Sequence, residues 1–451
     1  MAVLTEEQTM LRDMAREWGD NESPVTAFRR LRNAAPAEGF DVNAWGDMGQ
    51  MGWGGIVVPE AHGGSEFGYL SLGMVIEQLG RTLVAHPLGS TGPAATAIVL
   101  GDSDAAKSEW LPRIASGEAV ATLAIDEGPL HGGAIGTRVE DGRLTGTKAF
   151  VAEGDSAAAF VVAAADGLYL VAGDEGVTRS TRRMADARSH AEVRFDKAPA
   201  TRLGGTDLTA KIVDHATALV TAEMLGLAEQ AFATTNDYLK TRVQFGQQLS
   251  TFQALQHRMA KMLTELELMR SVVEGALEAI DARRSDLSQS VSLAKAVAGD
   301  TLRLVSREMI QLHGGIGMTD EHDAGFYMKR AAVLEAMWGN AAFHRERFAQ
   351  LAGAISACAA TSASTGRIDP SAIPSIIVPA KRRAIRLERS TIAVRTIAGR
   401  PDSAVVRSSG ARSANCTSSS VAIVLDSRCQ WLPPVSSASR CASLIVSKLR
   451  R

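Results

Sequence analysis

The sequence predicts a mostly α-helical α+β protein in which a small β-domain separates two helical domains. Apolar residues make up 45% of the 451 positions and aromatic residues only 5%, a balance typical of a helix-rich globular chain with a large core. Apolar residues recur at helical spacing early and late in the first 350 or so residues, whereas short apolar runs between turn residues fill the middle. We therefore expect an N-terminal helical domain, a middle β-domain, a C-terminal four-helix bundle and a tail, at residues 1–117, 118–210, 211–352 and 353–451.

The N-terminal domain begins with a helix start signal. Thr5 and Gln8 have the spacing of a capping box, and apolar residues then follow one helical face at Met10, Leu11, Met14 and Trp18. Helical patterns continue through 72–81 and 94–100. The first residues lack the basic and apolar stretches of a secretion signal, and no run of about 18 apolar residues occurs. We expect no export signal, no membrane span and a cytoplasmic location.

The middle domain differs in texture from residue 119 onward. Short apolar runs alternate with Gly- and Asp-rich turns, as the strands of a small sheet protein do. The runs lie at 121–125, 143–151, 158–164, 168–171 and 192–195. This pattern predicts a β-sandwich or a β-barrel.

The C-terminal domain has almost no helix breakers between Lys211 and Leu351. In its clearest stretch an apolar residue recurs every three or four positions, at Leu249, Phe252, Leu255, Met259, Met262, Leu266 and Met269. Four long helices fit this length. Helices with one apolar stripe each pack as a bundle, and such a bundle is a natural oligomer interface.

The tail differs in charge from the rest of the chain. Residues 355–451 hold 15 of the 48 Lys and Arg but only 4 of the 50 Asp and Glu, which leaves 33 basic and 46 acidic residues in the body. All four cysteines also lie in the tail, so the body needs no disulfide. Two interpretations stay open, namely out-of-frame translation and a basic, disordered interaction segment. The arginines lack interleaved aromatic residues, so we expect no nucleic-acid binding.

Two motifs carry most of the chemical information. Residues 242–249 read Arg-Val-Gln-Phe-Gly-Gln-Gln-Leu, and residues 311–318 read Gln-Leu-His-Gly-Gly-Ile-Gly-Met. Together with a Gly-rich segment at 51–64, they make the chain resemble the acyl-CoA dehydrogenase family over about residues 1–352. The resemblance implies that family's order of helical domain, β-domain and helical bundle, which agrees with the order expected above.

The resemblance assigns contacts with FAD to both motifs. In the family the first motif crosses a dimer interface and holds the pyrophosphate of the neighbour's FAD, here through Arg242, Gln244 and Phe245. The second lines the adenosine part, here through Gln311, Gly314 and Gly315. The arginine assignment also has a physical basis, because a guanidinium presents a rigid fork of donors to phosphate oxygens. Each charge-assisted bond contributes about 1.5–3 kcal/mol. We expect no metal site.

The catalytic glutamate that the resemblance leads us to expect is missing. Counting 23 residues beyond Gly315 reaches Trp338, where family members commonly carry the proton-abstracting carboxylate. The family's alternative position, on the first bundle helix, falls at Ala216. Glu335 and Glu223 are nearby candidates, but one helical turn moves a carboxylate by about 5 Å, whereas proton transfer needs contact at about 3 Å. We therefore expect no catalytic residue and interpret both glutamates as solvated or interface residues.

The positions that would serve a flavin ring of this chain's own also depart from the family. Asp126 stands where the family has a threonine whose hydroxyl contacts the flavin, and its charge would oppose a reduced, partly anionic ring. Phe150 keeps an aromatic ring at the next contact, but Ala152 replaces a hydroxyl donor.

The retained and lost residues predict a non-catalytic subunit of a heteromeric acyl-CoA dehydrogenase. The resemblance implies FAD as cofactor, a homologous partner that bears the catalytic Glu, an acyl-CoA substrate and an electron-transfer flavoprotein as acceptor. The implied reaction is α,β-dehydrogenation in β-oxidation, with steroid side chains and other bulky acyl groups among the substrates of such heteromers. Two alternatives stay open, an active homo-oligomer with a displaced base and a flavin-free interaction or regulatory protein on the same scaffold.

Overall fold

The computed structural model describes residues 4–353 and, further along, only the backbone of three short strands. These are β11 (Arg395–Thr396), β12 (Val421–Leu425) and β13 (Arg428–Gln430), which pair in that order. The other predictions for the tail lie outside the described residues. The chain divides into two compact units, Met1–Phe348 and Ala349–Arg451, and all the candidate site residues lie in the first.

The N-terminal part of the first unit is helical, as predicted. Its elements are α1 (Glu6–Asn21), α2 (Val25–Ala34), α3 (Val42–Gln50), η1 (Trp53–Gly55), η2 (Glu60–His62), α4 (Gly68–Arg81), α5 (Leu88–Leu100) and α6 (Asp104–Ala115). The predicted capping box is confirmed, because the side chains of Thr5 and Gln8 each accept the other residue's backbone N–H. Trp18 of α1 packs edge to face on Trp53, with ring centroids 5.6 Å apart, and so joins the first helix to the Gly-rich segment.

The middle part forms two four-stranded sheets. The strands are β1 (Ala121–Ala124), β2 (Arg138–Glu140), β3 (Arg143–Ala152), β4 (Ala159–Ala164), β5 (Gly167–Ala172), β6 (Val177–Arg183), β7 (Ser189–Pro199) and β8 (Thr201–Gly204). Their orders are β1-β4-β5-β8 and β2-β3-β7-β6. Phe160 of β4 and Phe195 of β7 meet in a shared apolar core, with ring centroids 5.7 Å apart. Of the two predicted forms, the sandwich is therefore present.

The first sheet is covered on its other face by helices. Leu123 of β1 and Val161 of β4 share a second core with Ile98 of α5 and with Ile212 of the long helix that follows the sheets. A sheet that is buried on both faces needs apolar residues at every position. This explains why these strands appear in the sequence as unbroken apolar runs without alternation.

The C-terminal part consists of helices and a small hairpin. Its elements are α7 (Thr206–Thr241), β9 (Val243–Gln244), β10 (Gln247–Gln248), η3 (Leu249–Thr251), α8 (Gln253–Asp281), α9 (Leu287–His313), η4 (Gly314–Met318), α10 (Ala324–Ala336) and α11 (Ala341–Leu351). The expectation of four long helices is wrong for the fourth, which is divided into α10 and α11. At the break, Trp338 and Gly339 have φ values of +53° and +91°, a conformation that apolar periodicity does not reveal.

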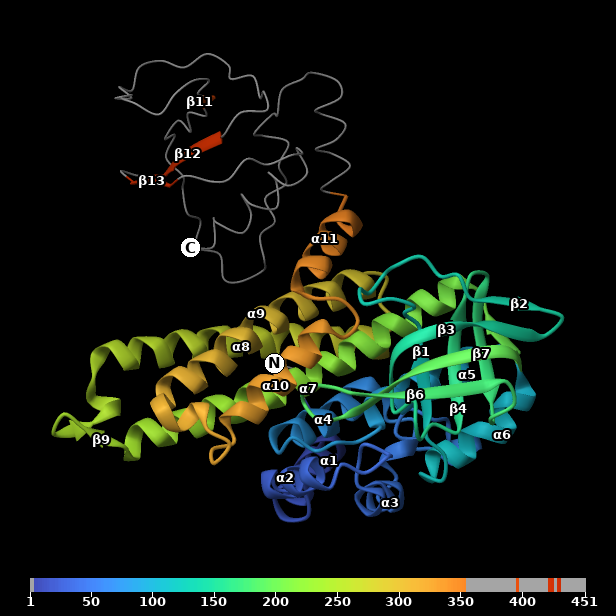
Figure 1. Ribbon diagram of the computed structural model, residues 1–451, viewed down its shortest axis with the longest axis horizontal. Helices are drawn as coiled ribbons and strands as arrows, with labels where there is room; N and C mark the ends of the chain where they lie inside the picture. The colour runs from blue at the N-terminus through green and yellow to red at the C-terminus, as the bar shows by residue number, and fades with distance from the viewer. Residues whose placement is uncertain (1–3, 354–394, 397–420, 426–427, 431–451) are drawn as a thin grey trace. The chain divides into compact units, whose positions relative to one another are not determined.

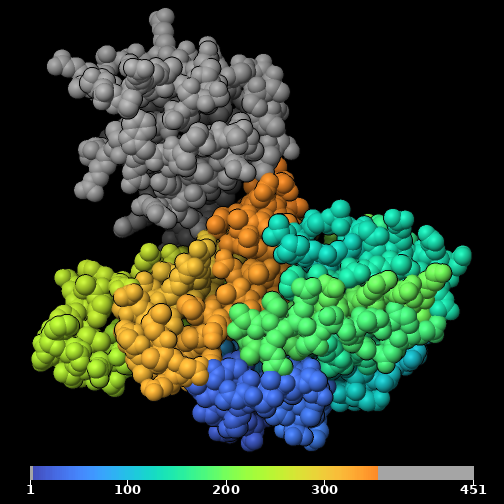
Figure 2. All heavy atoms as spheres, viewed as in Figure 1, coloured from blue at the N-terminus to red at the C-terminus, as the bar shows by residue number. Residues whose placement is uncertain are grey.

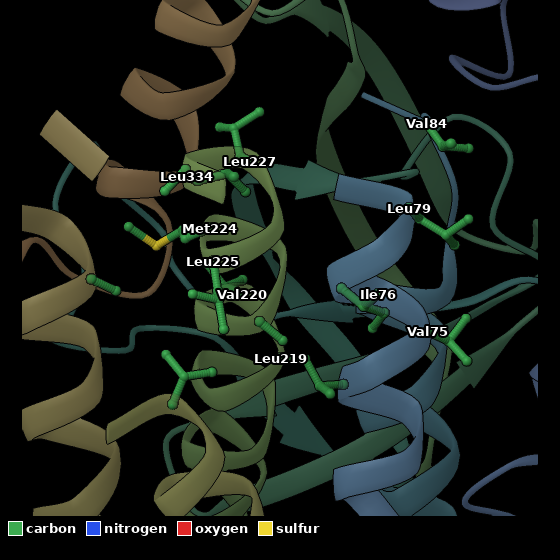
Figure 3. Close-up of a cluster of buried hydrophobic side chains, with 14 of the residues drawn as sticks. Val75, Ile76, Leu79, Val84, Leu219, Val220, Met224, Leu225, Leu227 and Leu334 are labelled. Carbon is green, nitrogen blue, oxygen red and sulfur yellow. The ribbon is translucent and has the colours of Figure 1, made fainter. Parts of the chain in front are cut away.

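Helix α7 connects the sheets to the opposite end of the unit, where the β9–β10 hairpin lies (Figure 1). Its buried side chains pack against those of α4, as Ile76 and Leu219 illustrate in Figure 3. Glycine lets the two helices approach closely. A Cβ on Gly80 would lie 2.7 Å from the Glu223 carbonyl, and one on Gly226 would collide with the backbone of Glu77.

The N-terminal helices cover one side of the first unit and contact both neighbouring parts. In the space-filling view these residues, drawn in blue, lie along the strands and the C-terminal helices (Figure 2). One large core joins them to the bundle, with Trp45 and Phe28 in the same cluster as Leu225 and Phe326. No helix within residues 4–353 has the length and hydropathy needed to cross a bilayer.

Candidate cofactor contacts and the region around Trp338

The first motif forms an exposed hairpin directly after α7. The Arg242 N–H donates to the Tyr238 carbonyl at 2.8 Å, so the hairpin starts from the last turn of the helix. Strands β9 and β10 pair over two residues each. Between them, Phe245 and Gly246 both have positive φ, at +55° and +80°, as a type I′ hairpin turn requires. The Phe245 side chain is 88% exposed, so the motif faces outward from its own chain.

Arg242 is free to bind a ligand. Its side chain is exposed, and no ion pair or hydrogen bond engages its guanidinium among residues 4–353. Gln244 is likewise exposed beside it. An unengaged guanidinium can offer its whole fork of N–H donors to phosphate oxygens. The residues present at the hairpin therefore fit a pyrophosphate group.

The second motif ends α9 and forms η4. Gly314 has φ of +65°, which favours glycine for backbone reasons. A Cβ on Gly314 or Gly315 would meet no atom within 4 Å, whereas one on Gly317 would lie 2.8 Å from the Ile310 carbonyl. The chain itself therefore explains glycine at 317 and leaves the space beside Gly315 open. Gln311 is exposed on the same motif. Open space beside an exposed glycine suits the close approach of a ligand.

The structure brings the two motifs together through a contact that the motifs themselves did not indicate. The Tyr238 ring stacks on the His313 ring with centroids 4.3 Å apart, and the Tyr238 hydroxyl donates to the His313 carbonyl at 3.3 Å. Tyr238 lies one helical turn before Arg242, and His313 directly precedes Gly314. An aromatic residue one turn before the first motif was the available sequence signal.

Trp338 lies in the turn between α10 and α11, and this turn is held from within the chain. Lys295 of α9 is fully buried, and its ammonium donates to three backbone carbonyls at 2.9–3.0 Å, those of Leu334, Glu335 and Gly339. Burial lowers the pKa of Lys295 to about 7. The Trp338 carbonyl accepts a hydrogen bond from His344 Nε2 at 2.7 Å. These bonds fix the backbone that carries the indole.

The indole packs against a histidine that is itself bound to Asp126. The rings of Trp338 and His131 meet edge to face at 6.0 Å, and Phe343 contacts the same imidazole at 5.3 Å. His131 Nδ1 lies 2.9 and 3.0 Å from the two Asp126 carboxylate oxygens. We refer to Trp338, His131, Phe343 and Asp126 as the Trp338 cluster. The Asp126 carboxylate is therefore engaged within its own chain.

The neighbouring Glu127 is also engaged. Its carboxylate accepts from Lys148 Nζ at 2.8 Å, and from the hydroxyl and N–H of Thr137 at 2.6 and 2.9 Å. Partial burial raises the pKa of Glu127, but these hydrogen bonds outweigh burial and bring it down to about 2. Such a carboxylate is a weak base.

Glu223 is a buried ion-pair residue, which corrects our interpretation of it as solvated or at an interface. Its carboxylate lies 2.8 Å from Arg330 and 3.3 Å from Arg188, and both arginines also bind Asp186. These four side chains form a buried charge cluster between α7, α10 and the turn before β7. Burial raises the pKa of Glu223, but the two positive charges more than offset it and hold the pKa below its usual range.

The other weak candidate, Glu335, does not lie free beside the indole either. Its side chain is 29% exposed and pairs with Arg303 at 3.8 Å. The family's alternative position, Ala216, is fully buried between α7 and the first sheet. The buried charge cluster was missed by sequence reasoning, because Asp186 and Arg188 lie far along the chain from both Glu223 and Arg330.

Phe150 and Ala152 are the residues that the resemblance places beside a flavin ring bound by this chain itself. Phe150 has φ of +52° and is 40% exposed, with the Arg182 guanidinium 5.3 Å from its ring centroid. Ala152 is buried, and its carbonyl accepts from the Thr122 hydroxyl at 2.7 Å. Neither side chain offers a hydrogen-bond donor.

A cavity of about 210 Å³ lies next to the Trp338 cluster. Its lining residues come from α7, α11 and the loop after β1, and they are His131, Ala210, Val213, Phe343, His344 and Arg347. The Arg347 guanidinium is held by the buried Asp214, at 2.6 and 3.0 Å. None of the described residues that line this cavity carries a carboxylate.

Comparison with known proteins matches the segments before and after the sheets to domains of one family. Residues 5–118 match the acyl-CoA dehydrogenase N-terminal domain, and residues 204–353 match the acyl-CoA dehydrogenase C-terminal domain. The acyl-CoA dehydrogenase IpdE2 of Mycobacterium tuberculosis is 31% identical over 330 residues, which cover 72% of this chain and 91% of that protein. IpdE2 of Mycolicibacterium smegmatis is also 31% identical, over 73% of this chain and 93% of the relative.

Solved structures agree. The structure described as the Tcur3481-Tcur3483 steroid ACAD G363A variant superposes with a TM-score of 0.72 at 28% identity, over 80% of this chain and 99% of that one. The ChsE4-ChsE5 complex from Mycobacterium tuberculosis gives a TM-score of 0.72 at 27% identity, over 78% and 99%. Both the matched domains and the arrangement of helices and sheets point the same way, and we conclude that this chain belongs to the acyl-CoA dehydrogenase family.

Proposed function

We propose that this chain is the non-catalytic subunit of a heteromeric, FAD-dependent acyl-CoA dehydrogenase that forms α,β-unsaturated acyl-CoA thioesters. The observation that carries the proposal is the indole of Trp338 at the position where the resemblance places the base. The carboxylates of Asp126, Glu127 and Glu223 are each held by an imidazole or a cation. None is left to take a proton from a substrate.

The heteromeric part of the proposal is supported by the similar structures. One is described as a complex of ChsE4 with ChsE5 and another as a steroid ACAD of Tcur3481 with Tcur3483. From these similarities we propose that this chain pairs with a homologous partner that bears the catalytic Glu, and that the substrate is a bulky, steroid-type acyl-CoA.

We also propose that the domains of this chain end at residues 117, 210 and 352.

In this proposal each chain contributes a separate part of the reaction. Arg242, Gln244 and Phe245 would hold the pyrophosphate of an FAD bound by the partner, and Gln311, Gly314 and Gly315 would line its adenosine part. Bound FAD supplies the acceptor for the hydride that leaves the β-carbon. The partner's Glu removes the α-proton, and an electron-transfer flavoprotein takes up the electrons afterwards. A cluster of aromatic side chains beside a paired Asp126 replaces the base in this chain.

Expression with and without homologous dehydrogenases tests this function. We expect the chain alone to be colourless and inactive, and the complex with its partner to be yellow and to reduce an artificial dye when acyl-CoA is added. Dye reduction by the chain alone would instead support a homo-oligomer with a displaced base. A colourless complex would support a flavin-free interaction protein.

A matched pair of substitutions tests the cofactor contact within that complex. Arg242→Ala removes the unengaged guanidinium at the hairpin and should lower FAD retention. Arg143→Ala removes another exposed guanidinium, on β3, which pairs with Glu175. This control should retain FAD as the unmodified complex does. Equal FAD content in both variants would contradict the role of Arg242.

A further inference from the structure

We propose that Tyr238 is a positioning residue that holds Arg242 and the Gly314–Gly315 turn in one fixed arrangement, so that both can engage the same FAD molecule. This inference rests on the proposed function, because it concerns the contacts that the chain makes with the partner's cofactor. It assigns a role to a residue that belongs to neither motif.

The first step is the position of Tyr238 between the motifs. Its backbone carbonyl accepts the N–H of Arg242 at 2.8 Å, which fixes the first residue of the hairpin to the helix. Its ring stacks on His313 with an interplanar angle of 29°, and its hydroxyl donates to the His313 carbonyl at 3.3 Å. One residue therefore contacts the start of the first motif and the residue that opens the glycine turn.

The second step is that His313 is itself held in place. The ring is buried, and its Nδ1 donates to the Met309 carbonyl at 2.7 Å. It also contacts the His322 ring at 4.4 Å, and His322 Nδ1 accepts the N–H of Ala324 at the start of α10. The rings of Tyr238, His313 and His322 thus connect the ends of α7 and α9 with the start of α10.

The hairpin itself is exposed and consists of very short strands. Residues 242–248 are all exposed, and a pair of two-residue strands is too short to be stable by itself. Two further contacts support it, the Leu249 N–H to Arg242 carbonyl bond at 2.9 Å and an edge contact between Phe245 and Phe252. Since charge-assisted bonds to phosphate depend on donor geometry, a displaced α7 terminus would weaken them.

The ring should contribute more than the hydroxyl. The hydroxyl bond of 3.3 Å is long for an O–H donor, whose usual range is about 2.5–3.0 Å. We therefore expect Tyr238→Phe to change the dissociation constant of FAD from the purified heteromer by less than about twofold. Tyr238→Leu, which removes the aromatic stack, should raise it about tenfold, within the range of coupling between contacting residues.

A double-mutant cycle with Arg242 separates positioning from general stability. If Tyr238 acts by orienting Arg242, Tyr238→Leu should cause much less additional loss of FAD in an Arg242→Ala complex than in the unmodified complex. The measurements are FAD titration of the heteromer, its elution volume and its unfolding temperature. Equal loss in both backgrounds would show that Tyr238 acts independently of Arg242 and would overturn the inference.

His313→Ala removes the same stack from the other side and provides a second variant if Tyr238→Leu folds poorly. The inference expects a comparable loss of FAD, and full retention in His313→Ala would contradict it. Arg242→Ala alone distinguishes failure of the positioning role from failure of the cofactor contact. If that variant loses FAD while the stack variants keep it, only the positioning role is wrong. If Arg242→Ala keeps FAD, the proposed contact of Arg242 with FAD is wrong, and the positioning role fails with it.

Discussion

The two ends of the helical bundle differ in how their polar groups are satisfied. At the hairpin end, Arg242 and Gln244 are exposed and the space beside Gly315 is open. Around Trp338, by contrast, Asp126 is bound to His131 and the turn carbonyls are bound to Lys295. At the hairpin end the polar side chains are exposed and available to a ligand, whereas around Trp338 the polar groups are hydrogen-bonded within the chain.

Polar groups that lack a partner in their own chain are the ones that can bind a ligand. A buried polar group that has a partner in its own chain has little to gain from a ligand, because binding would first have to break the existing bond. An exposed donor loses only water. We therefore expect substitutions near the Trp338 cluster and the buried charge cluster to affect folding, and substitutions at the hairpin to affect association and cofactor retention.

The largest expected effect comes from the buried charge cluster. Arg330 is 1% exposed and binds both Asp186 and Glu223. Arg330→Met would leave two buried carboxylates with Arg188 alone, and we expect it to lower the free energy of unfolding by about 3–5 kcal/mol in urea titrations. Arg303→Met, which breaks the more exposed pair with Glu335, is the control and should cost less than about 1 kcal/mol. Similar losses in both variants would contradict the expected difference between a buried and a more exposed ion pair.

A second, smaller effect should depend on pH. Burial raises the pKa of Glu153 to about 7. The Ser90 hydroxyl has one proton but lies within hydrogen-bond distance of two acceptors, the Pro87 carbonyl and Glu153 Oε2. Both contacts are satisfied when Glu153 is protonated and donates. Between about pH 4.5 and 7 the folded state keeps a proton on Glu153 that the unfolded state has already released. This contribution to stability is therefore lost as pH rises through that window.

Glu153→Gln should therefore stabilise the chain at pH 8, by on the order of 2–3 kcal/mol, and have little effect at pH 4.5. Urea unfolding at the two pH values measures this. Glu140→Gln, at an exposed position on β2, should show no such pH dependence. Loss of stability at pH 8 in Glu153→Gln would show that the buried carboxylate is needed in its charged form.

The smallest effect on folding is expected at the hairpin. Phe245→Ser removes an 88% exposed ring and should change the free energy of unfolding by no more than about 0.5 kcal/mol. Association with the partner should nevertheless weaken about tenfold or more, because exposed aromatic residues often anchor interfaces. Leu130→Ser is the matched control, since Leu130 is 77% exposed on a different loop. Equal association of both variants, measured by sedimentation, would place the interface elsewhere.

Local signals in the sequence were enough to predict much of the fold. The capping box at Thr5 is confirmed because it depends on residues three positions apart. Strands β4 and β5 were found because unbroken apolar runs between turn residues are short-range features. The division of the last helix was missed, because positive φ at Trp338 leaves no trace in apolar spacing.

Sequence reasoning could identify the candidate site only through a short motif. The motif around Arg242 spans eight consecutive residues and carries the family resemblance, but the hairpin that it forms was not predicted. Glu223 was interpreted as a solvated or interface residue; its partner Arg330 lies more than 100 residues away, and only the fold brings them together. The bond between Asp126 and His131 was missed although the residues are five apart, because a loop leaves their side-chain directions undetermined.

The most direct test of the central claim is the amount of FAD bound per chain in the purified heteromer, measured by absorbance against quantitative amino-acid analysis. We predict one FAD for each pair of chains, held jointly by the partner and by the Arg242 hairpin, and none on this chain when it is purified alone. Two FAD molecules per pair, or FAD bound by this chain alone and reduced by acyl-CoA, would contradict it.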